Sequence, residues 1–108
     1  METEVIRLRV RANEEVTVTT AGTPVNPTTD TRSEAIRVTN NNTARLVTVG
    51  STAAGSDATT SPKKGTVLRY LESHLMFLQK GGGRDAANEI FIDADTNGTI
   101  VTVEHMGV

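Results

Sequence analysis

Apolar and polar residues alternate with a period of two in several short runs of this chain, a pattern typical of strands that bury one face. The first run, Glu4–Arg11, sets three aliphatic side chains against three arginines, namely Ile6, Leu8 and Val10 against Arg7, Arg9 and Arg11. The same alternation recurs in Glu15–Thr20, Glu34–Thr39 and Ala44–Val49. These runs predict four strands. The asparagines at 40–42 predict a turn that joins the last two strands in a hairpin.

Two stretches lack any sustained apolar period. Ala21–Ser33 carries Gly22, Pro24, Pro27 and several threonines, which predicts an extended loop or arm. Gly50–Gly65 is rich in serine, threonine, alanine and glycine and has almost nothing to bury. We expect it to form a flexible surface loop.

The stretch Thr66–Lys80 supports two interpretations. Leucines recur at helical spacing and Gly81 follows as a cap, which favours a helix. Apolar residues also lie outside that stripe, and Glu72 and Ser73 could form a turn between strands at Gly65–Leu71 and Leu75–Lys80. The residues alone leave helix and hairpin open.

The C-terminal part shows the clearest local pattern. The runs Asn88–Thr96 and Thr99–His105 flank Asn97-Gly98, a strong indication of a two-residue hairpin turn because both residues accept positive φ. The register implied by that turn sets aliphatic residues opposite one another, with Ala94 facing Val101 and Ile92 facing Val103. We therefore predict a C-terminal hairpin.

Composition supports one small β domain over residues 1–108. The chain has no cysteine and no tryptophan, its hydrophobic content is 36%, and its net charge is −2. The core is therefore expected to be thin and aliphatic, without disulfides or thiolate metal sites. No apolar run approaches the length of a membrane span, and the charge gives no field for nucleic acid. We predict an all-β antiparallel sandwich, jelly-roll or immunoglobulin-like, with two long loops.

One segment matches a metal-binding pattern. The residues Asp93, Asp95, Asn97, Gly98 and Glu104 fit the calcium-loop spacing D-x-[DN]-x-[DN]-G-x5-E, in which oxygen ligands alternate and a glutamate closes the loop. The following residues are β-branched, however, whereas a calcium loop of this kind needs an exiting helix. A hairpin is the preferred interpretation, and a calcium-dependent binding module is kept as the alternative.

Few other residues suggest chemistry. His74 and His105 lie far apart in the sequence without a third ligand, so they are expected at a turn or the surface. The arginine stripe could meet an acidic partner surface or nucleic-acid phosphates, but a solvated sheet face that resists aggregation is the preferred interpretation. No acid–base pair at catalytic spacing can be named, so we expect neither an enzyme nor a cofactor.

Three segments, "AIRVTNNNTARLVTV", "GTVLRYLESHLMFLQK" and "DAANEIFI", follow an order of strands and turns that resembles small structural proteins of tailed bacteriophage particles. The resemblance covers roughly residues 34–108. It implies a hairpin at 66–80 and a non-enzymatic decoration or cement protein on the outer surface of the head. The host cytoplasm would be the site of synthesis, and a neck or tail position is a further alternative.

The resemblance also implies partners. These are the major capsid protein or other virion proteins, together with further copies of the chain, and neither membrane nor nucleic acid. We expect the partner-binding residues on the arginine stripe and the arm: Arg7, Arg9, Arg11, Pro24, Asn26 and Pro27.

Overall fold

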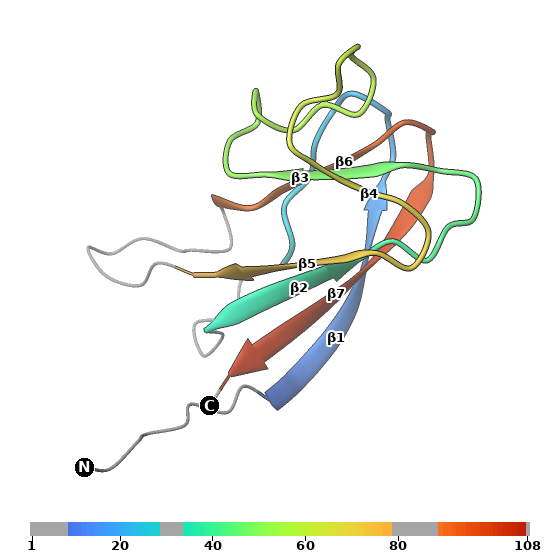
Figure 1. Cartoon of the computed structure of the whole chain (residues 1–108). Coiled ribbons are helices and arrows are strands. Elements are labelled where there is room, and N and C mark those ends of the chain that lie inside the picture. Colours follow the sequence, from blue (N-terminus) through green and yellow to red (C-terminus); the bar gives the residue numbers. More distant parts are fainter. Residues whose placement is uncertain (1–8, 29–33, 79–88, 108) are drawn as a thin grey trace.

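The computed structural model describes residues 9–28, 34–78 and 89–107, which form two antiparallel sheets that enclose one core (Figure 1). The strands are β1 (Arg9–Val18), β2 (Ala35–Thr39), β3 (Val47–Gly50), β4 (Thr66–Leu68), β5 (Ser73–Phe77), β6 (Phe91–Ala94) and β7 (Thr99–Gly107). One sheet has the strand order β1-β7-β2-β5, and the other has the order β4-β3-β6. The predicted all-β sandwich is therefore confirmed.

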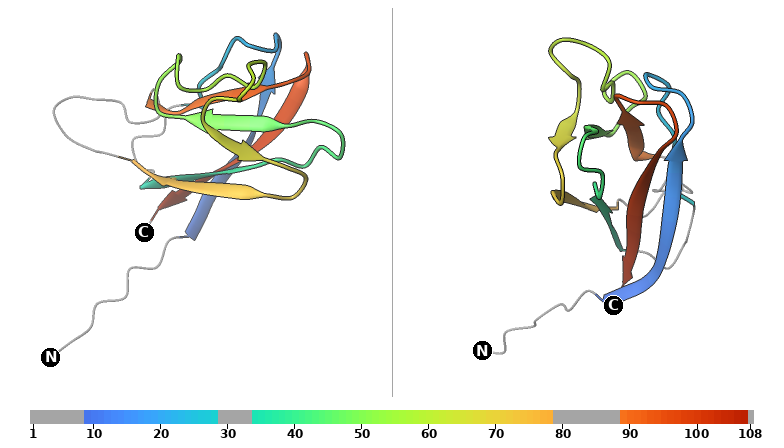
Figure 2. Two further views of the ribbon diagram at one scale, coloured as in Figure 1. Left: turned by 45° about the horizontal axis from the view of Figure 1, so that its top comes forward. Right: turned by 90° about the vertical axis from the view of Figure 1, so that its right-hand side faces the viewer.

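The strand pairs are nested along the chain. The first strand pairs with the last, β1 with β7. Inside that pair, Val25 bridges Ile92 of β6, then β2 pairs with β5, and finally β3 pairs with β4. Such nesting rolls one long antiparallel hairpin into two facing sheets, as Figure 2 shows from two further sides. This connectivity is that of a jelly roll, with one strand reduced to the Val25 bridge.

The predicted hairpins are wrong in their pairing, although their strands exist. β6 and β7 lie in different sheets, and so do β2 and β3, and β4 and β5. At the C-terminal turn, Gly98 has a φ of 75° and donates its N–H to the carbonyl of Val18 at 2.8 Å. The Asn97-Gly98 pair thus reverses the chain as predicted, but β7 pairs with β1 and β2 instead of β6.

The register predicted for the C-terminal hairpin is wrong because β6 and β7 lie in different sheets. Ile92 and Ala94 of β6 and Val101 and Val103 of β7 are all fully buried. The sequence indicates correctly that these residues share one apolar environment. Two strands that face each other across a core produce the same pattern as two strands side by side in one sheet.

The ambiguous stretch 66–80 forms strands over its described part. A tight turn between β4 and β5 places Leu71 at a φ of 65°. The carboxylate of Glu72 accepts the N–H of Arg69 at 2.6 Å, which closes that turn. The helix interpretation is wrong, because the chain forms β4 and β5 there, and alternate residues of β5 are half-buried instead of a helical stripe.

The first strand departs from the predicted two runs. β1 is continuous, with a bulge between Val10 and Ala12. The bulge shifts the alternation, so that Val16 and Val18 point into the core while Val10 is 45% exposed. The prediction that Val10 is buried is wrong for this reason.

In the described part of the chain, the buried hydrophobic cluster is aliphatic, as the composition predicts. The two sheets contribute valines, isoleucines, one leucine and one alanine to a single cluster: Val16, Val18, Ile36, Val38, Val47, Val49, Leu68, Ile90, Ile92, Ala94, Val101 and Val103. Each strand supplies them from one face only, so the outer faces remain for other uses.

The loop 50–65 packs on the outer face of the three-stranded sheet. Ser56 and Ala58 are fully buried there, and the Ser56 hydroxyl lies 3.1 Å from that of Thr48, which is also buried. Asp57 and Lys64 exchange backbone hydrogen bonds across the loop. The expectation that this segment has nothing to bury is wrong, because polar residues of the sheet face require partners that the loop supplies.

Asn40 binds backbone groups of two crossings, the connections β2–β3 and β4–β5 in which the chain passes from one sheet to the other. Its amide nitrogen donates to the carbonyls of Arg45 at 2.8 Å and Leu68 at 2.9 Å, and its side-chain oxygen accepts the N–H of Asn42 at 2.9 Å. Its backbone also bonds the β4–β5 turn at Leu71 and Glu72. This side chain is fully buried, and one residue therefore holds two neighbouring crossings.

We expect Asn40→Ala to lower the free energy of unfolding by about 2–3 kcal/mol, because buried carbonyl and N–H groups lose their partners. Urea denaturation measures this change. Asn41→Ala is the matched control. Asn41 is exposed, and its side-chain nitrogen donates a hydrogen bond to the hydroxyl of Thr102 at the surface. A loss equal to that of the control would contradict the role of Asn40.

Candidate functional site

The residues of the calcium-loop pattern hold backbone groups of the loops. Asp93 is fully buried, and its two oxygens accept the N–H groups of Gly22 at 3.0 Å and Ala58 at 2.8 Å. The carboxylate therefore ties both long loops to β6. Asp95 accepts the N–H of Leu46 at 3.1 Å in the same way.

Asn97 and Glu104 serve other elements. The side-chain oxygen of Asn97 accepts the N–H of Ala21 at 2.8 Å. Glu104 lies on the outer face of the four-stranded sheet, where Arg37 binds both of its oxygens at 2.7 and 2.8 Å. Within the described part of the chain, no three acidic or histidine side chains lie close enough to hold a metal ion. The geometry therefore does not bring the proposed calcium ligands together.

We expect calcium to leave the melting temperature unchanged, because the Asp93 oxygens already accept backbone N–H groups. A calcium site loaded at 100 times its dissociation constant would add about 2.7 kcal/mol, which is several degrees for a domain of this size. Differential scanning fluorimetry with and without calcium measures the effect. A rise of that size, lost in Asp93→Asn, would restore the calcium interpretation.

The arm is bound along its described part, 21–28. Val25 exchanges two backbone hydrogen bonds with Ile92, each 2.8 Å long. The side-chain nitrogen of Asn26 donates to the carbonyl of Ile90 at 2.8 Å, and Pro27 is buried. Pro24 is half-buried. The predicted partner-binding residues of the arm thus pack against their own domain because β6 offers an open edge there, and residues 29–33 lie outside the described part.

Glu14 and His105 form a pair that the sequence did not suggest. Glu14 lies on the inward face of β1 together with Val16 and Val18, and one of its oxygens lies 3.0 Å from Nε2 of His105. His105 is 3% exposed, so its expected position at a turn or the surface is wrong. The same Glu14 oxygen accepts the N–H of Thr28 at 2.7 Å, which fixes the end of the arm.

The surroundings of Glu14 act on its pKa in opposite directions. Desolvation by burial raises the pKa, whereas hydrogen bonds from Thr28 and the contact with His105 lower it, and the net pKa lies below the usual value. A carboxylate with a lowered folded pKa stabilises the fold above its unfolded pKa of about 4.3 and ceases to do so as the pH falls through the lower folded value.

Acidification from about pH 5 to about pH 3 should therefore destabilise the parent more than the Glu14→Gln variant. Urea denaturation across this pH range gives the difference. Glu15→Gln removes a neighbouring exposed carboxylate and should follow the parent. If Glu14→Gln and the parent lost stability in parallel, the carboxylate of Glu14 would not stabilise the arm.

Two of the three predicted arginines lie in the described part, and Arg7 lies outside it. Arg9 and Arg11 are exposed on β1, an edge strand of the four-stranded sheet, on either side of Val10 at the bulge. They form a basic end of that edge. The sequence therefore locates an exposed charged surface correctly for these two residues.

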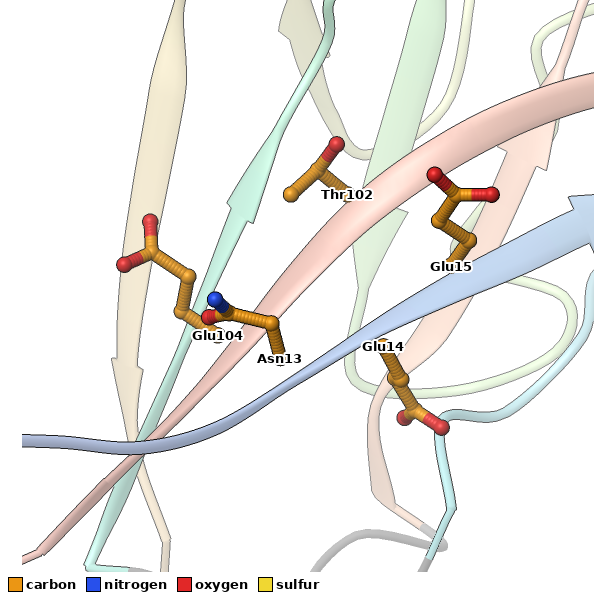
Figure 3. Close-up of a pocket in the computed structure, with 5 residues that line it drawn as sticks. All are labelled: Asn13, Glu14, Glu15, Thr102 and Glu104. Atoms are coloured by element: carbon orange, nitrogen blue, oxygen red, sulfur yellow. The ribbon is translucent and has the colours of Figure 1, made fainter.

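A shallow polar hollow of about 420 Å³ opens along β1 and β7 (Figure 3). It is lined by Asn13, Glu14, Glu15, Thr102 and Glu104. Figure 3 shows Glu14 on the opposite side of β1 from Asn13 and Glu15. Glu104 is bound to Arg37, and Glu15 is exposed on the same outer face. The hollow is a sheet surface with hydrogen-bond acceptors.

Apolar side chains that sequence reasoning missed are exposed beside β5. Tyr70, Leu71, Leu75 and Phe77 are 49%, 62%, 40% and 70% exposed. The available indication was the run of apolar residues on both faces of 75–78, because a strand that buries one face needs polar residues on the other.

No protein-family model, curated protein or solved structure matches the chain. Among residues 9–28, 34–78 and 89–107, no helix is long and apolar enough to cross a membrane.

Proposed function

We propose that this chain is a non-enzymatic structural protein of a tailed-phage particle, attached to the outside of the head through the major capsid protein. The main observation in support of the proposal is that buried and half-buried polar side chains bind backbone groups of the loops. Asp93, Glu14 and Asn40 each hold loops or crossings onto the sandwich. The side chains are thus committed to a stable body with broad outer faces, which is what a coat component needs.

Two further observations support the proposal. Residues 34–108 resemble small structural proteins of tailed-phage particles in the order of their strands and turns. The nested strand pairs form a jelly roll, an architecture that recurs in viral capsid proteins. The second point is an analogy of fold, and function depends on the surface.

The surface proposed for attachment is the basic end of β1. Arg9 and Arg11 are exposed there, and the bulge splays the strand away from a flat edge. Guanidinium groups form two-pronged hydrogen bonds with carboxylates, so an acidic patch on the shell protein fits this end. Charges at the rim of an interface mainly accelerate encounter, and salt screens them.

Reversal of charge at this end should weaken attachment. We expect Arg9→Glu with Arg11→Glu to slow binding to heads of the encoding phage by roughly tenfold or more at low ionic strength, and by less at high salt. Heads stripped of outer proteins, mixed with the purified chain and sedimented, measure the bound fraction over time. An unchanged melting temperature shows that the variant remains folded.

The matched control reverses Lys64 and Arg69, which are exposed away from β1 and change the net charge equally. Attachment by the control but not by the β1 variant supports the proposed surface. Equal attachment by all three chains places the interface elsewhere on the molecule. If the parent binds neck or tail assemblies but not heads, the alternative of a neck or tail protein replaces the head proposal.

A further inference from the structure

The open edge of β5 presents backbone groups that no described strand pairs. β5 bonds only β2 in its sheet. The bonds at its two ends run from Leu78 N–H to the carbonyl of Glu34 at 2.9 Å and from Asn40 N–H to the carbonyl of Glu72 at 3.1 Å. Because bonded pairs alternate in an antiparallel ladder, the even-numbered residues of β5 face β2. The odd-numbered ones, Ser73, Leu75 and Phe77, direct their N–H and C=O groups outward.

The side chains of the same three residues lie on the outer, exposed face of β5. Leu75 is 40% and Phe77 70% exposed. Strand β5 (Ser73–Phe77) contains no aspartate, glutamate, lysine or arginine. Natural sheets usually protect an open edge with charges, prolines or bulges.

The other edge of this sheet has such protection. β1 carries a bulge and the exposed charges Arg9, Arg11 and Glu15. Of the two edges of this sheet, the β5 edge alone is therefore suited to the addition of another strand. This difference argues that β5 is a docking edge and limits assembly through it to a single partner strand.

The geometry points to a second copy of this chain as that partner, with the two β5 strands antiparallel about a twofold axis at Leu75. In this register Leu75 faces its own counterpart, and Ser73 faces Phe77 at either end. All three pairs are of the hydrogen-bonded kind, so each exchanges both N–H···O bonds. The two four-stranded sheets then become continuous across the dimer.

The pattern of β5 is self-complementary in shape and charge. A small serine opposes a large phenylalanine on both sides of the axis, and two leucines meet at its centre. Arg37, the register partner of Leu75 on β2, is neutralised by the bidentate contact with Glu104. Identical copies therefore meet along an uncharged strip without like-charge repulsion. A twofold contact of this kind closes at the dimer.

The available area indicates a weak dimer. An aromatic side chain buries roughly 150–250 Å² in full, and Phe77 and Tyr70 are already partly covered. A stable interface buries about 800 Å² on each partner. The two aromatic side chains together with the exposed Leu71 and Leu75 supply less than this area. Association should consequently be weak and depend on concentration.

Sedimentation equilibrium of the full chain, over a concentration series up to about 1 mM, tests this inference. We expect the parent to shift from monomer to dimer. Leu75→Lys and Leu75→Glu should each remain monomeric, since like charges then meet on the axis. An equimolar mixture of the two variants should recover the dimer, because opposite charges now pair. Ile100→Lys, an equally exposed change on the central strand β7, should dimerise like the parent.

Three outcomes would overturn the inference. The parent could stay monomeric throughout, Leu75→Lys could dimerise as the parent does, or the mixture could fail to recover the dimer while circular dichroism shows folded variants. A monomeric parent whose attachment to heads is lost in Leu75→Lys would assign the edge to a strand of the shell protein instead. The inference stands apart from the proposed head attachment, which is tested at β1.

Discussion

Each time this chain crosses from one sheet to the other, its backbone leaves one hydrogen-bond ladder before it joins the next. The crossings lie at the rim of a thin core, where unpaired N–H and C=O groups cost about as much as the core residues contribute. Short polar side chains meet this need. Asn40 does so between β2 and β3 and between β4 and β5, Asp95 accepts the N–H of Leu46 between β2 and β3, and Asn97 accepts the N–H of Ala21 after β1. The jelly roll depends on these bonds because most of its connections change sheet.

The need to pair backbone N–H groups also explains what the acidic residues Asp93 and Glu14 bind. Asp93 sits on the outer face of β6, yet it is buried because the segments 21–28 and 50–65 close over it and donate N–H groups to both of its oxygens. Glu14 holds the arm at Thr28 and contacts His105. Carboxylates that would look catalytic or metal-binding in the sequence thus serve as anchors for loops that have few apolar residues of their own.

The strands β1 and β5 form the two edges of the four-stranded sheet (Figure 1), and these edges differ in their side chains. The β1 edge is charged and bulged, whereas the β5 edge is neutral and apolar. The proposed functions follow from that difference: charge at β1 suits an acidic shell surface, and the β5 strip suits its own copy. A protein that binds weakly through each edge gains avidity when many copies share one particle.

The all-β class, most strand positions, the aliphatic core and the chain reversal at Asn97-Gly98 could be predicted from the sequence, because these depend on alternation and on local backbone preferences. The sequence also located the exposed Arg9 and Arg11. It did not determine which strands pair, since Ile92 and Val103 show the same apolar pattern whether they lie side by side or face each other across a core. The contacts of Glu14 with Thr28 and His105 required the arm and β7, and the burial of Asp93 required two loops distant in the sequence. These features depend on the folded chain, because each arises from contacts between segments that no local pattern connects.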